Sequence, residues 1–259
     1  MMPKFAANLS MLFTEIPFPE RFEAAAAEGF HAVEYLFPYE HSKDELRGLL
    51  RSAGLTQVLF NLPPGDWGAG DRGLASLPDR RQEFRASLDL ALEYAEALEC
   101  RQLHVMAGNA HEDQVALETY IANIRFAAER AAELGVSILL EPLNGRDMPG
   151  YFLRSVAQAV RTLEEIDREN VRLQLDLYHA QITDGDVTNL IRKVLPWISH
   201  VQIASVPDRQ EPDKGELFYP HVLAVLDEAG YGGWVGCEYH PAGDTRAGLA
   251  WLQEYKEDR

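Results

Sequence analysis

The sequence predicts a single (β/α)8 barrel, the TIM-barrel fold, that spans residues 1–259. Three observations support this expectation: short apolar runs alternate with longer segments of helical spacing, the apolar runs number eight, and these units fill the chain. A barrel of this kind takes roughly 250 residues. The repeating units therefore leave no room for a second domain.

The eight apolar runs are expected to form the strands of the barrel. They are rich in β-branched and other apolar residues with little polar alternation, which is typical of parallel strands covered on both faces. In chain order the expected strands are Phe5–Leu9, Ala32–Leu36, Gln57–Asn61, Gln102–Met106, Ser137–Glu141, Arg172–Asp176, His200–Ile203 and Trp234–Glu238.

Segments with apolar residues at helical spacing lie between these strands. The clearest expected helices are Arg21–Glu28, Asp44–Ala53, Glu83–Leu98, Gln114–Leu134, Val156–Ile166 and Val222–Ala229. Four of them lead into a glycine that supplies the left-handed turn closing a helix before the next strand. These glycines are Gly29, Gly54, Gly135 and Gly230.

One connection is longer than usual, the segment Leu62–Gly73 after the third strand. Long loops in compact domains tend to be functional, and this one is expected at the strand C-terminal side, where barrel active sites lie. Trp67 in this loop is a candidate to cover a small substrate. A rigid surface loop with a packed tryptophan is the alternative.

Composition excludes several classes of partner. The formal net charge is −17, the basic residues are scattered, and such a surface repels nucleic acid. No apolar run approaches the roughly 20 residues that span a bilayer, and the start lacks the pattern of a secretory signal, so a cytoplasmic protein is expected. Cys100 and Cys237 form no disulfide or zinc motif and are expected to be small buried residues.

Polar residues occur at the ends of four successive strands, where apolar ones would otherwise be expected. They are Glu141, Asp176, Gln202 and Glu238. Their spacing is close to one βα unit of an eightfold barrel, so the four side chains should converge at the C-terminal mouth.

Three facing carboxylates would raise one another's pKa values unless a proton, a cation or rim arginines and lysines relieve the repulsion. Two glutamates, an aspartate and an amide are an oxygen-rich set that suits Mg²⁺ or Mn²⁺. The sequence therefore predicts a divalent metal site formed by Glu141, Asp176, Gln202 and Glu238.

Further candidates follow the sixth, seventh and eighth strands. His179, three residues after Asp176, can reach the mouth as a hydrogen-bond donor or acid–base group. Arg209 is the best candidate to hold an anionic substrate group, because a guanidinium binds a carboxylate through two hydrogen bonds. Lys214 and His240 are weaker alternatives, and His104 can be structural or functional.

Several segments together resemble the hydroxypyruvate isomerase family, a group of xylose-isomerase-like barrels. The resemblance covers nearly the full chain and rests on Phe5–Phe13, Val33–Tyr39, Pro64–Gly70, His200–Ala204 and Gly233–Tyr239. It implies an intramolecular oxidoreductase that interconverts hydroxypyruvate and tartronate semialdehyde through an enediolate. It also implies that Glu141 and Glu238 are the paired acid–base groups, and that they bind the metal together with Asp176 and Gln202.

A sister branch of that family isomerises 2-oxo-tetronate, moving the carbonyl to carbon 3. The segments Glu141–Asn144, Met148–Phe152 and Asp176–His179 resemble the hydroxypyruvate branch, whereas Pro207–Arg209 followed by Glu211–Asp213 resembles the tetronate branch. The family commonly has Lys where this chain has His240. The expected partner is a small anionic keto or hydroxy acid, bound by a monomer or a homo-oligomer.

Three other classes of protein remain open from the residues. A sugar epimerase would use the same acids, and a non-catalytic hydroxy-acid binding protein would not need two opposed glutamates. A metal-dependent endonuclease would want more histidine ligands and a basic groove, which the eight histidines and the net charge of −17 do not favour.

Overall fold

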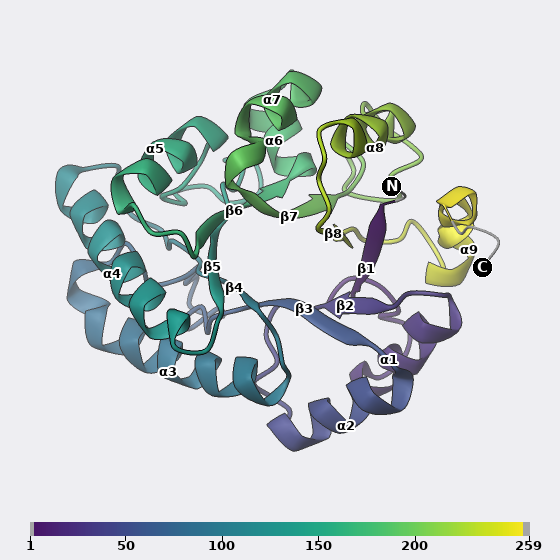
Figure 1. Cartoon of the computed structure of the whole chain (residues 1–259), viewed down its shortest axis with the longest axis horizontal. Helices are drawn as coiled ribbons and strands as arrows, with labels where there is room; N and C mark the ends of the chain where they lie inside the picture. Colours follow the sequence, from purple (N-terminus) through teal and green to yellow (C-terminus); the bar gives the residue numbers. More distant parts are fainter. Residues whose placement is uncertain (1–2, 256–259) are drawn as a thin grey trace.

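The computed structural model describes residues 3–255, so the first two and last four residues of the expected domain lie outside it. Eight parallel strands close into a barrel in chain order, and the helices surround it (Figure 1). The strands are β1 Lys4–Asn8, β2 Ala32–Glu34, β3 Thr56–Asn61, β4 Gln102–His104, β5 Ser137–Leu140, β6 Val171–Asp176, β7 Ile198–Ile203 and β8 Trp234–Cys237. Each expected strand is confirmed, and β8 pairs with β1 to close the ring.

All six expected helices are confirmed, with ends shifted by a few residues. The α-helices are α1 Phe18–Ala27, α2 Lys43–Ala53, α3 Arg81–Ala97, α4 Gln114–Ala132, α5 Val156–Ile166, α6 Leu177–Thr183, α7 Val187–Val194, α8 Tyr219–Glu228 and α9 Thr245–Gly248. Three 3₁₀ helices complete the described elements: η1 Pro78–Arg80, η2 Leu195–Trp197 and η3 Leu249–Tyr255. The short helices α6, α7 and α9 were not expected, because they offer too few turns for a clear apolar period.

Short polar side chains begin several of these helices. Ser42, Asp113 and Ser155 each accept a hydrogen bond from a backbone N–H in the first turn of α2, α4 and α5. At the other end of α2, Gly54 adopts a left-handed φ of 66° and its N–H reaches carbonyls of the last turn. The predicted end of α2 at Gly54 is therefore confirmed.

Two apolar clusters hold the barrel together. The larger one lies between the strands and the surrounding helices, and the smaller one consists of Ala6, Ala32, Val58, Leu59 and Leu139. Because side chains alternate along a strand, residues two positions further along share a face. Four members of the small cluster are followed in this way by the polar residues Asn8, Glu34, Asn61 and Glu141. An apolar floor thus lies beneath a polar layer at the C-terminal end of the barrel.

Gly236 of β8 leaves the space that one of these polar side chains occupies. A Cβ atom at this position would lie 2.6 Å from the carboxylate carbon of Glu34. We expect Gly236→Ala to lower the free energy of unfolding by about 1–3 kcal/mol, because overpacking a closed interior forces side chains and backbone to shift. Urea unfolding of the two proteins measures this difference.

The control for Gly236→Ala is Gly48→Ala in helix α2. No heavy atom lies within 4 Å of a Cβ built at Gly48. Alanine there should stabilise the protein by about 0.5–1 kcal/mol, because a glycine in a helix interior loses more backbone entropy on folding. Equal effects of the two alanines would mean that Glu34 does not depend on the space at Gly236.

Two features of the described chain complete the fold. Cys100 and Cys237 are both free and buried, as expected. Among residues 3–255, none of the helices combines the length and apolar character needed to cross a membrane.

Candidate active site

Three carboxylates lie at the carboxyl ends of the last strands of the barrel. Asp176 is the final residue of β6, and Glu141 and Glu238 directly follow β5 and β8. Only 5% of Glu141 and 4% of Glu238 is exposed. The predicted convergence of Glu141, Asp176 and Glu238 is reflected in the contacts among them and with Arg209.

A chain of short contacts joins these acids. Ligand atoms of Glu141, Asp176 and His179 all lie within 4.8 Å of one another. Asp176 and Glu238 share a hydrogen bond. Arg209 Nη2 lies 3.1 Å from Glu238 Oε2 and 3.4 Å from Asp176 Oδ2. The structure thus brings four of the predicted site residues around Asp176.

The environment disfavours ionised carboxylates. Burial is the main cause that raises the pKa of Glu141, and the neighbouring Glu238 and Asp176 raise it further. Burial also raises the pKa of Glu238 to about 8, although Arg209 acts in the opposite direction. Asp176 has a pKa raised by burial and lowered in part by Arg209. Without a further cation, burial and mutual repulsion favour the protonated forms of these groups.

Arg209 reaches this cluster from the loop after β7, where its backbone has a left-handed φ of 53°. Its guanidinium lies 4.9 Å from the ring centre of Tyr178, and its Nε is buried without a hydrogen-bond partner. Burial alone would lower the pKa of Arg209, but Glu238 and Asp176 raise it above its ordinary value. Arg209 is therefore a permanent cation whose buried Nε–H has no hydrogen-bond partner.

The hydrogen bonds of His179 fix its tautomer. The backbone N–H of Asn144 donates to His179 Nδ1 at 3.2 Å, so Nδ1 is an acceptor. Burial, together with Arg209, lowers the pKa of His179 well below its ordinary value, so the ring is neutral and its proton is on Nε2. Nε2 lies 3.5 Å from Asp176 Oδ2. Arg209 Nη2 is 3.4 Å from the same Nε2, but both atoms are donors, so this contact is not a hydrogen bond. His179 is thus a hydrogen-bond donor in the site.

His104 at the end of β4 borders Glu141 on another side. Its Nδ1 lies 3.2 Å from Asn61 Oδ1 and 3.4 Å from Glu141 Oε2. Burial lowers the pKa of His104 to about 3, so the ring is neutral. Since both neighbours of Nδ1 are oxygens, Nδ1 carries the proton and is directed at them.

The donor set fits a divalent cation. Three carboxylates and one guanidinium have a combined charge of −2 when all are ionised, and Glu141 Oε1 is buried without a hydrogen-bond partner. Carboxylate oxygens are the ligands that Mg²⁺ and Mn²⁺ prefer. His179 lies close enough to Glu141 and Asp176 to share a metal ion with them, but its protonated Nε2 is a hydrogen-bond donor and not a ligand.

Gln202 lies level with Asp176 in the barrel but is engaged with other side chains. Its Nε2 donates to Glu34 Oε1 at 2.8 Å, and its Oε1 accepts from Gln174 at 2.7 Å. Glu34 also accepts hydrogen bonds from Asn8 at 3.0 Å and contacts His200 at 2.6 Å. This interior network was not predicted from the sequence.

Two predicted substrate contacts lie in outer loops. Trp67 is 40% exposed, and its ring lies 5.6 Å from Phe37 and 3.8 Å from the guanidinium of Arg72. His240 is exposed, and its backbone N–H donates to the carbonyl of Arg209 at 2.9 Å. The contacts found for both residues in the described chain are therefore with loop neighbours rather than with the acids.

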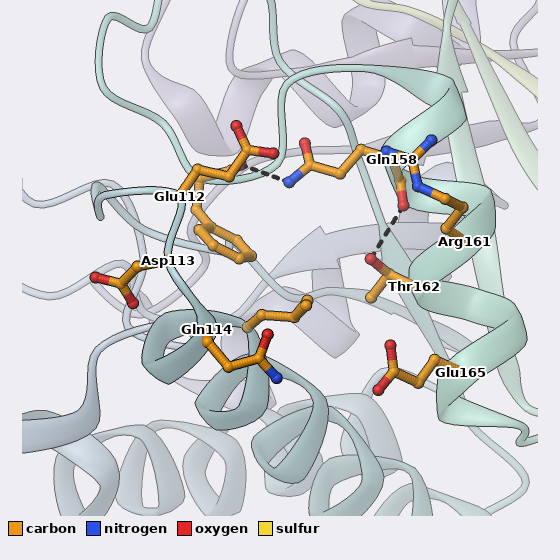
Figure 2. A pocket seen from close by; sticks show the side chains of 9 residues that line it. Glu112, Asp113, Gln114, Gln158, Arg161, Thr162 and Glu165 are labelled. Carbon is orange, nitrogen blue, oxygen red and sulfur yellow. Dashed lines mark hydrogen bonds between the residues drawn. The ribbon is translucent and has the colours of Figure 1, made fainter.

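A separate hollow of about 320 Å³ lies outside the barrel, between α4 and α5. Figure 2 shows Glu112, Asp113 and Gln114 on one side of it and Gln158, Arg161, Thr162 and Glu165 on the other. None of the predicted site residues lines this hollow. This hollow is therefore separate from the residues predicted to carry the chemistry.

A closed parallel barrel with a buried carboxylate centre at the carboxyl ends of its strands defines a TIM-barrel protein whose candidate site lies where the active sites of such barrels are found. The family model described as xylose isomerase-like TIM barrel matches residues 22–255, and the chain belongs to this family. The expected fold class and the resemblance stated from the sequence are both confirmed.

Full-length relatives give the activity of the group. The chain is 52% identical to a 2-oxo-tetronate isomerase of Cupriavidus necator, over 98% of this chain and 99% of the relative. It is 40% identical to the hydroxypyruvate isomerase of Escherichia coli, over 98% of this chain and all of the relative. These relatives confirm the expectation of an isomerase.

A solved structure from Brucella melitensis is similar over the whole barrel, with a TM-score of 0.97, 55% identity, and coverage of 99% of this chain and 100% of that one. It is described as an AP endonuclease of family 2. The net charge of −17 and a single three-residue cluster of potential metal ligands in the described chain favour an isomerase here over a nuclease.

Proposed function

We propose that the protein isomerises 2-oxo-tetronate to 3-oxo-tetronate, and that hydroxypyruvate is a poorer substrate of the same site. The observation that carries the reaction is the convergence of Glu141 and Glu238, from β5 and β8, beside Asp176 and Arg209. Two buried carboxyl groups with raised pKa values are suited to proton transfer near neutral pH.

The order of similarity supports the four-carbon substrate. Relatives named 2-oxo-tetronate isomerase are 52%, 49% and 47% identical to the chain, whereas relatives named putative hydroxypyruvate isomerase reach 47% and the hydroxypyruvate isomerase of E. coli is 40% identical. Hydroxypyruvate, the substrate favoured from the sequence, lacks only the terminal hydroxymethyl group. The same proton transfer therefore applies to both acids.

The reaction balances without an oxidant. One glutamate removes the proton from carbon 3, and the released electron pair forms the C2–C3 double bond while the carbonyl oxygen on carbon 2 becomes an alkoxide. The hydroxyl proton on O3 moves to O2, carbon 2 receives a proton from the other glutamate, and the carbonyl forms on carbon 3. The substrate is oxidised at carbon 3 and reduced at carbon 2.

Two other side chains have roles that follow from their donors. Arg209, whose side chain is 17% exposed, offers its guanidinium to the substrate carboxylate, which gives an acidic protein the local cation that an anionic substrate needs. The neutral His179 offers Nε2–H to a substrate oxygen on which negative charge develops. Trp67 and His240 stay candidates for substrate contact from the loops.

Glu141, Asp176 and Glu238, with the oxygen of Gln202, would hold Mg²⁺ or Mn²⁺ in the isomerase. When bound, the ion would stabilise negative charge on the substrate oxygens. It would also balance the carboxylates, so that Glu141 and Glu238 can be ionised and accept protons.

An NMR assay in D₂O with Mg²⁺ compares 2-oxo-tetronate and hydroxypyruvate. We expect both to be converted, with kcat/KM roughly tenfold or more in favour of 2-oxo-tetronate, because a site built for the hydroxymethyl group loses binding energy without it. Deuterium should appear at carbon 2 of the product. Failure to convert either acid would refute the proposed function, and a preference for hydroxypyruvate would refute the substrate order.

A further inference from the structure

The polar network beneath the acids centres on Glu34, the last residue of β2. Glu34 is 1% exposed. It accepts from Asn8 Nδ2 at 3.0 Å and from Gln202 Nε2 at 2.8 Å, and its other oxygen lies 2.6 Å from His200 Nε2. None of the ion pairs found between residues 3 and 255 joins Glu34 to a lysine or arginine. Side-chain amides and one imidazole therefore surround this carboxylate.

The barrel is shaped around this carboxylate. Gly236 leaves the space that it fills, since a Cβ atom there would lie 2.6 Å from the Glu34 carboxylate carbon. Gly236 is level with Gln202 on β7 and with Ala6 on β1. A glycine on β8 thus makes room for a buried acid of β2, which lies on the other side of β1.

A carboxylate oxygen accepts hydrogen bonds. Both amides around Glu34 turn their nitrogen atoms toward it. Gln202 then has its oxygen on the opposite side, where it accepts from Gln174 at 2.7 Å. Asn8 uses its oxygen to accept the N–H of Ser10 at 3.1 Å. One acid thereby sets the orientation of two amide groups.

Each of these amides also lies next to a carboxylate of the candidate active site. Asn8 Nδ2 also lies 3.5 Å from Oε1 of Glu238, one of the two proposed acid–base groups. Gln202 is paired with Asp176 in the register of β6 and β7, and its oxygen is a proposed metal ligand. A flipped Asn8 would face Glu34 and Glu238 with its oxygen. A flipped Gln202 would face Glu34 with its oxygen and Gln174 with its nitrogen.

We infer that Glu34 is a positioning residue that fixes which way the amides of Gln202 and Asn8 face, so that Asn8 Nδ2 is directed at Glu238 and the Gln202 amide is held level with Asp176. This inference rests on the proposed function for the identity of the site. Removal of a group that orients a metal-binding side chain typically lowers metal affinity or activity by roughly 10–100-fold. Glu34 acts through its neighbours and does not contact the substrate.

The test compares Glu34→Gln with Glu34→Asp. Glutamine keeps the size of the side chain but adds an NH₂ donor, whereas aspartate is shorter but still only accepts. A residue that merely fills space should tolerate glutamine better than aspartate. A residue that orients amides should tolerate aspartate better than glutamine.

Titration with Mn²⁺, followed by electron paramagnetic resonance without substrate, gives the first readout. We expect Glu34→Gln to weaken Mn²⁺ binding by roughly 10–100-fold and Glu34→Asp to weaken it less. In turnover, kcat of Glu34→Gln should fall by a similar factor with little change in KM. The reverse order of the two variants, or Mn²⁺ affinity and kcat of Glu34→Gln within threefold of wild type, would overturn the inference.

His200→Asn is the matched control in the same network. It removes the group that faces one oxygen of Glu34 and leaves Asn8 and Gln202 on the other. Mn²⁺ affinity should stay within about threefold of wild type, and a larger loss would count against orientation by Glu34. If circular dichroism shows that neither Glu34 variant folds, Asn8→Asp gives the test, because it replaces the donor to Glu34 and Glu238 by an acceptor, and an unchanged kcat would overturn the inference. Wild-type protein that binds Mn²⁺ but converts neither acid would refute the proposed function alone.

Discussion

Glu141→Gln and Glu238→Gln are each expected to lower kcat by about 10²–10⁴-fold, the range typical of general acid–base catalysis. An amide has nearly the size of the carboxyl group but neither accepts nor returns a proton at neutral pH. Both side chains are almost fully buried, so water has little access to replace them. Steady-state rates with 2-oxo-tetronate measure the loss.

Hydrogen exchange separates the roles of the two glutamates. In D₂O, the variant that keeps the base for carbon 3 should exchange that hydrogen of the substrate without forming product, and the other variant should show neither exchange nor product. Glu15→Gln is the control, because Glu15 binds Thr245 outside the site. A folded Glu141→Gln or Glu238→Gln protein with wild-type turnover would exclude that residue from the acid–base pair.

Removal of divalent metal by a chelator is expected to lower turnover by about 10³-fold or more, because a bound ion contributes several kcal/mol of charge stabilisation. Without it, burial and mutual repulsion raise the pKa of Glu141, and the pKa of Glu238 is about 8, so both acids tend to be protonated. Addition of Mg²⁺ or Mn²⁺ should restore the rate. The metal content of the stripped protein is measured alongside turnover.

Asp176→Asn provides the companion to the chelator experiment. It removes one negative charge from the cluster while it keeps the size of the side chain, so the added metal should no longer restore full turnover. Metal should also raise the melting temperature of the wild type, since a ligand bound only to the folded state stabilises it. Unchanged turnover of the stripped wild type would instead support a mechanism with glutamates alone.

Most of the barrel could be predicted because its signals are local. Apolar runs mark each strand, and glycines mark four helix ends; at one of them, Gly54 adopts the expected left-handed turn. Helix α6 was missed because it follows β6 without a loop. Asp176 is the last residue of β6, and its carboxylate accepts the N–H of Tyr178 in the first turn of α6. Asp176 therefore ends a strand and caps a helix at once, and a helix of this length has too few residues to show a period.

Three members of the polar layer, Asn8, Glu34 and Asn61, were missed although the same signal was present, and His104 was named without a defined role. Strands β5 to β8 were read for polar residues near their ends, which gave Glu141, Asp176, Gln202 and Glu238. Strands β1 to β4 end in Asn8, Glu34, Asn61 and His104, and each of these is buried. The rule applied to the last four strands would have found the Glu34 network if it had been applied to all eight.

Other features of the site depend on contacts that a sequence does not contain. Arg209 was predicted to hold an anion, but its loop has no periodicity that would place it beside Asp176 and Glu238. The tautomer of His179 follows from the backbone N–H of Asn144, 35 residues away. Both assignments needed the folded loops that bring these groups together.

The most direct test of a common cation site is the anomalous scattering of Mn²⁺ in crystals of the loaded protein. The arrangement of the strand ends predicts one strong peak among the carboxylates of Glu141, Asp176 and Glu238, and its loss in Asp176→Asn. A peak away from these carboxylates, or none at saturating Mn²⁺, would contradict it.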